Sequence, residues 1–542
     1  MTRKIIVFAL FLTLFACAKK SEQTLYDDPG KPGYGDTMVT AGIGEASNLI
    51  PILSTDSASH EVAGYIFNGL VKYDKDLNIE GDLAESWEYS RDKLSITFHL
   101  RKGVRWQDGK PFTARDVEYT YKVITDPKTP TAYAGDFLLV KRFEVLDDYT
   151  VRVTYDKPFA PALISWGTSI LPRHLLEGKD ITTSPLGRKP VGTGPYKLKD
   201  WITADRIVLT SNHDYFEGRP YVDRRVIRVI PDSATIFLEL KNSGVDMTGL
   251  TPLQYVKQTD YPKFHREFHK FKYLSFSYVY LGYNLQHPFF KDRRVRLAMT
   301  YAINKQEIIE GILFGQGVVA DGPFKPDMWA YNPKVTKYPY DARKALELLA
   351  EAGFKKGPDG LLVKDGRPFE FTVLTNQGNT VRIQCAELIQ RRLAEIGISV
   401  KIRVIEWATF VNQFIDKRDF DAVILGWTIP NDPDIYDIWH SSKTGPKELN
   451  FVGFSNKEVD ELLVKARETF SQEERKKYYW RIQEILAEEQ PYTFLFIPYA
   501  TIAVQKRFKG IEPAPAGIMY NVTKWYVPEG QVRYKTNANL HP

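Results

Sequence analysis

Catalytic side chains in enzymes occur in recognisable patterns, and this sequence lacks several of them. No G-x-S-x-G is present, which excludes the nucleophile elbow of an α/β-hydrolase. His265 and His269 share a possible helical face, but no acidic residue stands where a metalloprotease base would, so a surface pair is the favoured interpretation. Gly42 and Gly44 lack the third glycine of a dinucleotide loop. The sequence therefore favours binding over catalysis, and we expect no catalytic residue, no metal and no cofactor.

The chain contains only two cysteines, Cys17 and Cys385. This number excludes a disulfide framework and a zinc site made of a cysteine cluster. Cys385 falls on the apolar face of a predicted helix, so a small buried hydrophobe is favoured over the alternative of a nucleophile.

Two segments carry polar groups that could hold a solute. Arg382 opens a predicted helix, where its planar guanidinium and the helix dipole both favour an anion such as a ligand carboxylate; a plain surface arginine is the alternative. Residues 426–434 (GWTIPNDPD) follow a short apolar run at 420–425 that is typical of a buried parallel strand. Since ligands in open α/β sheets bind beyond the carboxyl ends of strands, we expect 426–434 to border a binding cleft.

The elements that must position these groups alternate between strand and helix patterns. A strand at 369–373, a helix at 382–396 stopped by Gly397, and a strand at 398–404 predict a β-α-β unit and therefore a parallel, doubly wound sheet. Further strands are predicted at 94–100 and 149–155, and further helices at 342–352, 457–469 and 472–488.

The first 17 residues read as a signal peptide. A positive start is followed by an apolar run at 5–16, too short to span a bilayer permanently, and by Leu14-Phe15-Ala16-Cys17, which resembles a bacterial lipobox. Cys17 is therefore the predicted lipidation site, with an ordinary cleaved signal and a chance cysteine as the alternative. Residues 18–36 are polar and rich in Gly and Pro, which predicts a flexible tether between the lipid anchor and the folded body.

Composition sets broad limits on size and partners. The 542 residues are 43% hydrophobic and 26% charged, which is ordinary for a globular protein and allows three or four domain-sized units. The net charge of +6 is spread out, without a run of five like charges, so nucleic-acid binding is not expected.

Five segments, in order, resemble family 5 of the extracytoplasmic solute-binding proteins, the oligopeptide-, dipeptide- and nickel-binding components of ABC importers. They are 83–118 (beginning LAESWEYS), 192–196 (GTGPY), 283–303 (beginning YNLQHPFF), 386–434 with Glu406-Trp407, and 451–466 (beginning FVGFSNKE). The resemblance implies an α/β, periplasmic-binding-protein-like fold with two lobes, a hinge and an additional inserted domain. By resemblance the first lobe comprises 37–60, 192–282 and 498–542, the inserted domain 61–191, and the second lobe 283–497.

The resemblance also implies how a ligand is held. In peptide-binding relatives the peptide lies extended between the lobes and adds a strand to exposed backbone. Gly426, Trp427 and Thr428 resemble the segment that offers this backbone, and Trp407 and Tyr133 resemble aromatic residues of the cleft; core packing is the alternative for both tryptophans.

One feature departs from the family pattern. Peptide-binding members place an aspartate two or three residues after the Gly-Trp dipeptide to pair with the ligand's ammonium, and Ile429 and Pro430 stand there instead. Asp432 is the candidate replacement, with capping of the following helix as the alternative.

We therefore expect a monomeric receptor in the periplasm or cell envelope, lipid-anchored to a bacterial membrane, that delivers short peptides to an ABC permease. One alternative keeps the fold and changes the ligand to a nickel chelate, haem, an opine or a sugar. Another is a periplasmic enzyme or chaperone-like factor.

Overall fold

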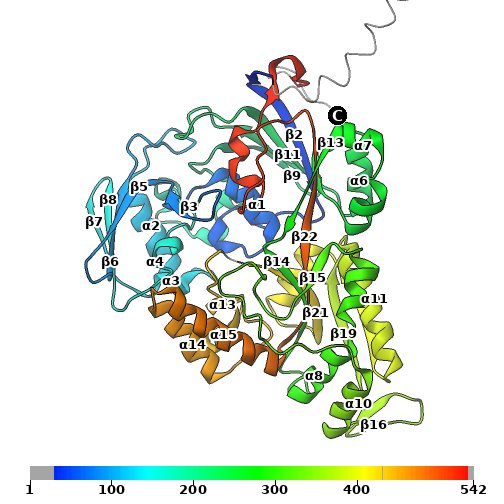
Figure 1. Ribbon diagram of the computed structural model, residues 1–542. Helices are drawn as coiled ribbons and strands as arrows, with labels where there is room; N and C mark the ends of the chain where they lie inside the picture. Colours follow the sequence, from blue (N-terminus) through cyan, green and yellow to red (C-terminus); the bar gives the residue numbers. More distant parts are fainter. Residues whose placement is uncertain (1–29, 430, 535–542) are drawn as a thin grey trace, which may run out of the picture.

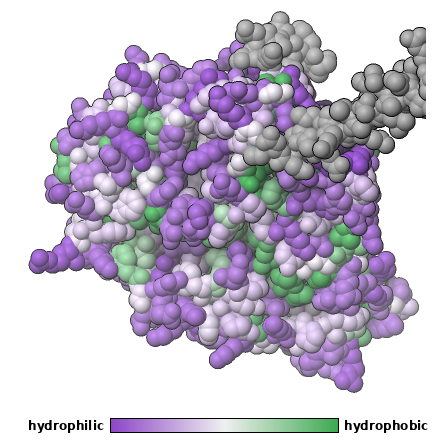
Figure 2. All heavy atoms as spheres, turned by 45° about the horizontal axis from the view of Figure 1, so that its top comes forward, coloured by the Kyte–Doolittle hydropathy of each residue, from purple (hydrophilic) through white to green (hydrophobic). Residues whose placement is uncertain are grey.

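The computed structural model describes residues 30–429 and 431–534, so Cys17, the predicted signal peptide and Pro430 lie outside it. The fold is α/β, with sheets and helices alternating along the chain (Figure 1). On the face drawn in Figure 2, hydrophilic residues predominate and hydrophobic ones gather in smaller areas between them. No helix within the described ranges has the length and apolar character needed to cross a membrane.

One sheet of twelve strands runs through most of the molecule. Its path is β20 (Ser399–Ile405), β19 (Glu370–Asn376), β21 (Ala422–Thr428), β14 (Ser277–Tyr283), β22 (Tyr492–Gln505), β12 (Met247–Gly249), β2 (Gly35–Gly42), β11 (Val222–Val229), β10 (Arg206–Ser211) and β9 (Tyr196–Ile202), with β13 (Phe268–Leu274) and β15 (Gly317–Val319) also paired to β22.

The long strand β22 joins the two halves of this sheet. Its first residues pair with β14 and β15, and its later residues pair with β13 and β12. Figure 1 shows β22 passing between the upper and lower parts of the molecule, beside the connection from β13 to β14. The two parts are therefore linked by few chain segments, all of them strands or strand connections.

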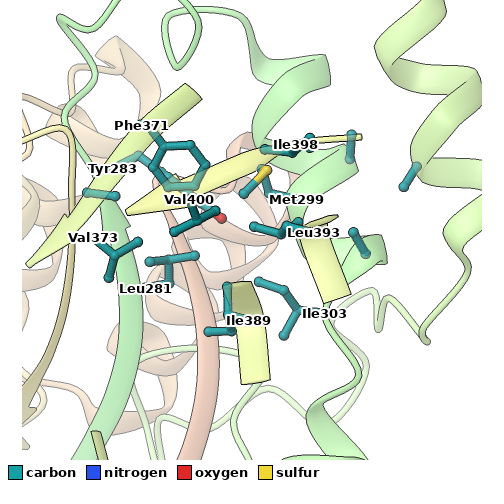
Figure 3. Packing of buried hydrophobic residues seen from close by; sticks show 14 of the residues in the cluster. Leu281, Tyr283, Met299, Ile303, Phe371, Val373, Ile389, Leu393, Ile398 and Val400 are labelled. Atoms are coloured by element: carbon teal, nitrogen blue, oxygen red, sulfur yellow. The ribbon is translucent and has the colours of Figure 1, made fainter. Parts of the chain in front are cut away.

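The predicted β-α-β unit is confirmed. Strands β19 and β20 are parallel, and α11 (Thr380–Glu395) connects them. The Asn379 side chain accepts the Arg382 N–H and starts the helix, and Gly397 ends it with a φ of +82°, a conformation that favours glycine. Cys385 is fully buried in this helix, as predicted. Figure 3 shows the core between α11 and the strands, with Ile389 and Leu393 facing Val373 and Val400.

Strands β14 and β21 are apolar along their length because both faces of the sheet are covered. Val279 and Leu281 belong to one hydrophobic cluster, whereas Tyr278 and Tyr280 belong to the cluster on the other face. The predicted strand at 420–425 is β21, which is parallel to β19 and antiparallel to β14, so the sheet is mixed and not purely parallel.

Residues between β2 and β9 form a separate core. A four-stranded antiparallel sheet packs against α2 (Ala114–Thr125), and a smaller hairpin precedes it. The strands of the sheet are β5 (Ala84–Tyr89), β6 (Ser95–Leu100), β8 (Thr150–Tyr155) and β7 (Val140–Asp147), and those of the hairpin are β3 (Val71–Tyr73) and β4 (Ile79–Gly81). The strands predicted at 94–100 and 149–155 are thus confirmed.

The remaining helices lie around these sheets. They are α1 (Ser57–Ile66), α3 (Ala134–Phe137), α6 (Ser233–Lys241), α7 (Pro262–Glu267), α8 (Arg293–Ala302), α10 (Ala342–Glu351), α12 (Trp407–Thr409), α13 (Tyr436–Trp439), α14 (Lys457–Glu468) and α15 (Gln472–Glu489), together with α4 (Ala162–Ser165), α5 (Arg173–Leu176) and α9 (Lys305–Glu307). The helices predicted at 342–352, 457–469 and 472–488 are confirmed as α10, α14 and α15.

The start of the folded body differs from the predicted end of the tether. The tether is predicted to reach residue 36, but β2 begins at Gly35 and Asp36 is buried against Arg507, with 2.6 Å between Asp36 Oδ2 and Arg507 Nη1. The composition of this stretch does not reveal a partner that lies 471 residues away. The lobe and domain limits themselves stay predictions.

Candidate functional site

A cavity of about 710 Å³ lies where α1, β21 and α12 approach one another. Its lining includes Tyr133, Trp407 and the three residues from Gly426 to Thr428, which come from distant parts of the chain. A second cavity of about 250 Å³ shares Ser57, Glu61 and Trp407 with the first and is also lined by Arg382. Six of the seven predicted binding residues therefore border two adjoining cavities.

The backbone of β21 has a free side beside the larger cavity. The Ile429 N–H donates to the Phe276 carbonyl at 2.8 Å, and the antiparallel register continues through Trp427 opposite Tyr278. Because backbone groups alternate in direction along such a pair, Gly426 and Thr428 point theirs away from β14. Strand β19 covers that side only at Ala422 and Val423.

The two tryptophans have different surroundings. Trp427 is half-buried; its indole N–H donates to the Tyr492 hydroxyl at 3.1 Å, and its ring lies 5.7 Å from that of Phe451. Trp407 begins α12, where Glu406 caps the helix, and it lies so close to Gly44 that a Cβ at Gly44 would come within 3.1 Å of the indole ring. Both rings border the cavity while resting partly on the core.

Tyr133 enters the cavity from the separate core between β2 and β9. Its hydroxyl donates to the Ser54 carbonyl at 3.1 Å and lies 3.0 Å from Nε2 of His60. His60 lies on α1 and borders the same cavity. The tyrosine is therefore held in place by residues of a different part of the fold.

Arg382 is a cation without a carboxylate partner among the described residues. One Nη donates to the Asn376 side-chain oxygen at 2.9 Å, and Nε has no hydrogen-bond partner. Burial lowers the pKa of Arg382 to about 10, which leaves it charged at neutral pH. A Cβ at Gly426 would lie 2.9 Å from the other Nη, so the absent side chain at 426 makes room for the guanidinium.

Asp432 borders a third cavity, of about 560 Å³, that adjoins the first at Thr428. Both of its carboxylate oxygens bind Arg475, at 2.9 and 2.6 Å. Asp434 likewise binds Arg467, and its side chain accepts the N–H of Tyr436, the first residue of α13. Asp432 does not cap this helix, whose N-cap residue is Ile435.

The sequence patterns did not point to His60, Glu61 or Asp416, which also line the larger cavity. His60 and Glu61 lie on the exposed side of α1, whose other side buries Ser59, Val62 and Ala63. Two adjacent polar residues opposite an apolar face are a usable signal, but they are equally typical of any surface helix.

The pattern around His265 does not form a single helical face. Helix α7 ends at Glu267 and β13 begins at Phe268, so His265 and His269 lie on different elements. Over residues 30–429 and 431–534, no group of three or more His, Cys, Asp or Glu side chains is placed to hold a metal ion.

Comparisons with known proteins agree with this architecture. The family described as bacterial extracellular solute-binding proteins, family 5 (middle region), matches residues 78–448. Oligopeptide-binding protein AppA of Bacillus subtilis is 37% identical over 96% of this chain and 97% of its own length. Its solved structure, in complex with a nonapeptide, has a TM-score of 0.88 over 92% of this chain and all of that chain.

Two further relatives are associated with ligands other than peptides. Heme-binding protein A of Haemophilus influenzae is 31% identical over 94% of this chain and 96% of its own length. The structure of NikZ from Campylobacter jejuni in complex with Ni(L-His) is 31% identical, with a TM-score of 0.82 over 91% of this chain and 99% of that chain.

These matches confirm the predicted family, the periplasmic-binding-protein-like fold and the prediction of a binding protein instead of an enzyme. The chain belongs to family 5 of the bacterial extracellular solute-binding proteins.

Proposed function

We propose that this protein captures short peptides in the adjoining cavities beside β21 and delivers them to an ABC permease. The observation that carries the proposal is the free backbone of Gly426 and Thr428, which faces the larger cavity. An extended peptide can pair with these groups as an added strand, so affinity comes from main-chain hydrogen bonds that do not depend on peptide sequence. Trp407, Trp427 and Tyr133 then supply contact surface for the side chains.

Arg382 supplies the charge for the carboxylate of the peptide. A half-buried guanidinium without a carboxylate partner is costly to maintain, and an incoming carboxylate offsets that cost by forming charge-assisted hydrogen bonds. The proposal does not include the predicted ammonium-binding role of Asp432, because Arg475 already binds both of its oxygens.

A second candidate keeps the fold and replaces the peptide by a nickel chelate, haem, an opine or a sugar. Two relatives support this candidate, one described as binding heme and one solved with Ni(L-His). The aspartate that would pair with a ligand ammonium is also missing after Gly426-Trp427, so the ligand need not carry a free amine there.

The deciding experiment is to denature the purified protein, identify what is released by mass spectrometry, and titrate the refolded protein calorimetrically with a peptide mixture. We expect recovered peptides and a loss of at least tenfold in affinity in Arg382→Gln, whereas Arg481→Gln, a matched change at a surface arginine of α15, binds as the wild type does. Recovery of haem or a nickel complex, together with no heat from any peptide, would refute the peptide proposal.

The location is proposed from the sequence outside the described residues. Cys17 carries the lipid, residues after it tether the body, and the protein works as a monomer in the periplasm or cell envelope. Cys17→Ser should move the protein from the membrane fraction to the soluble fraction of lysed cells. If the variant stays with the membranes, the lipid anchor is wrong.

A further inference from the structure

The smaller cavity, of about 250 Å³, has the chemistry of a side-chain pocket. It lies between α1 and the strands β10 and β11, and apolar side chains form much of its wall: Val62, Ile207, Ile227 and Val229. Two charged residues complete it, Arg382 from α11 and Glu61 from α1. An apolar wall with one cation and one anion suits a ligand group that is itself part apolar and part charged.

Glu61 is free to bind such a group. It is exposed to solvent, borders both cavities, and forms no ion pair with another described residue. Loss of hydration beneath the neighbouring protein raises the pKa of the Glu61 carboxyl, while the Arg225 charge acts in the opposite direction. Arg225, on β11, is buried with its guanidinium carbon 4.5 Å from the centre of the Tyr65 ring; it attracts the Glu61 carboxylate but forms no ion pair with it among the described residues.

Two other acids beside the larger cavity already have partners, and a third, Asp416, does not border the cavity of Arg382. Asp56 accepts hydrogen bonds from the Ser47 and Ser59 hydroxyls and from the Ser59 N–H, and so caps α1. Glu448 lies 3.4 Å from the Lys443 ammonium. Glu61 is thus the acid that borders both the site proposed for the peptide backbone and the cavity of Arg382.

We infer that this cavity holds a basic side chain, lysine or arginine, at the carboxyl-terminal residue of the peptide. The inference rests on the proposed function. Arg382 binds the terminal carboxylate, the methylene stem lies along the apolar wall, and the ammonium or guanidinium pairs with Glu61. Long basic side chains combine an apolar stem with a charged head in this way.

The position of Glu61 in the cavity makes the pocket selective for a basic side chain. An ion pair sheltered by the cleft is less screened than one on the open surface, so Glu61 discriminates strongly between a basic residue and an uncharged one of equal length. A neutral side chain of similar shape fills the pocket but leaves Glu61 without a partner.

The test compares pentapeptides that differ only at the last residue, four alanines followed by lysine or by norleucine, each with a free and with an acetylated amino terminus. Calorimetry on the full chain gives the affinities for wild type, Glu61→Gln and the control Glu473→Gln, an exposed acid on α15. We expect wild type and the control to prefer lysine by about tenfold, and Glu61→Gln to lose that preference while binding norleucine as before.

Three results would overturn the inference. Equal affinity of wild type for lysine and norleucine removes the pocket's selectivity. Equal weakening of both peptides by Glu61→Gln makes the residue structural. If Glu61→Gln keeps the preference for lysine and instead loses the wild type's preference for a free over an acetylated amino terminus, Glu61 binds the amino terminus of the peptide. Peptides that bind without the lysine preference leave the proposed function standing, whereas no binding of any peptide removes both.

Discussion

Breaking the ion pair of Asp432 and Arg475 tests whether Asp432 stabilises the fold or binds the ligand. In Asp432→Asn the Arg475 guanidinium, 8% exposed, loses its charged partner and keeps the Tyr479 hydroxyl at 3.1 Å and at most one hydrogen bond to the new amide oxygen. Breaking a fully buried pair costs about 3–5 kcal/mol, and because the Asp432 side chain is 22% exposed we expect about 2 kcal/mol. For a cooperative unit of 150–250 residues this corresponds to a fall in Tm of about 4–8 °C.

Scanning calorimetry measures this fall, and isothermal titration measures peptide affinity in the same variant. Glu458→Gln is the matched control, since Glu458 pairs with Arg481 in a similar geometry on the surface, with side chains 54% and 40% exposed. It should change stability by less than about 0.5 kcal/mol. If Asp432→Asn keeps its Tm but loses more than tenfold in affinity, Asp432 holds the ligand's ammonium and our reasoning is wrong.

Three further changes test other parts of the structure. Trp427→Ala should weaken peptide binding at least tenfold and lower stability by only about 1–2 kcal/mol, because the ring is half-buried and donates one hydrogen bond; equal losses in calorimetry and melting would place it in the core. Gly426→Ala should displace the Arg382 guanidinium and reduce binding by titration, with a stability loss of about 1–3 kcal/mol; unchanged affinity would contradict this. Burial raises the pKa of Asp82 to about 6. Since the folded pKa lies above the unfolded value, the free energy of unfolding of wild type relative to Asp82→Asn should fall by about 2 kcal/mol as the pH rises from 4 to 7, measured by denaturant titration; a rise would contradict this.

Local patterns predicted the elements near the site well. The alternation at 398–404 and the helical spacing ending at Gly397 are short-range signals, and they correspond to β20 and α11. The apolar run at 420–425 also predicted a buried strand, because a strand covered on both faces needs apolar residues throughout.

The role of Asp432 could not be predicted in the same way. Its partner Arg475 lies 43 residues further along the chain, and no local pattern distinguishes a paired carboxylate from a free one. The same limit applies to Asp36, which lies within the predicted tether yet pairs with Arg507.

The sequence by itself determined the family, the β-α-β unit and the segment from Gly426 to Thr428, because motifs and periodicity are properties of neighbouring residues. Only the tertiary structure decided which charges remain available to a ligand. Arg382 and Glu61 come from α11 and α1 and meet at one cavity, whereas Asp432 is occupied by Arg475. The physical reason is that the state of a charge depends on what lies within a few ångströms of it, and the fold brings those neighbours from distant parts of the chain.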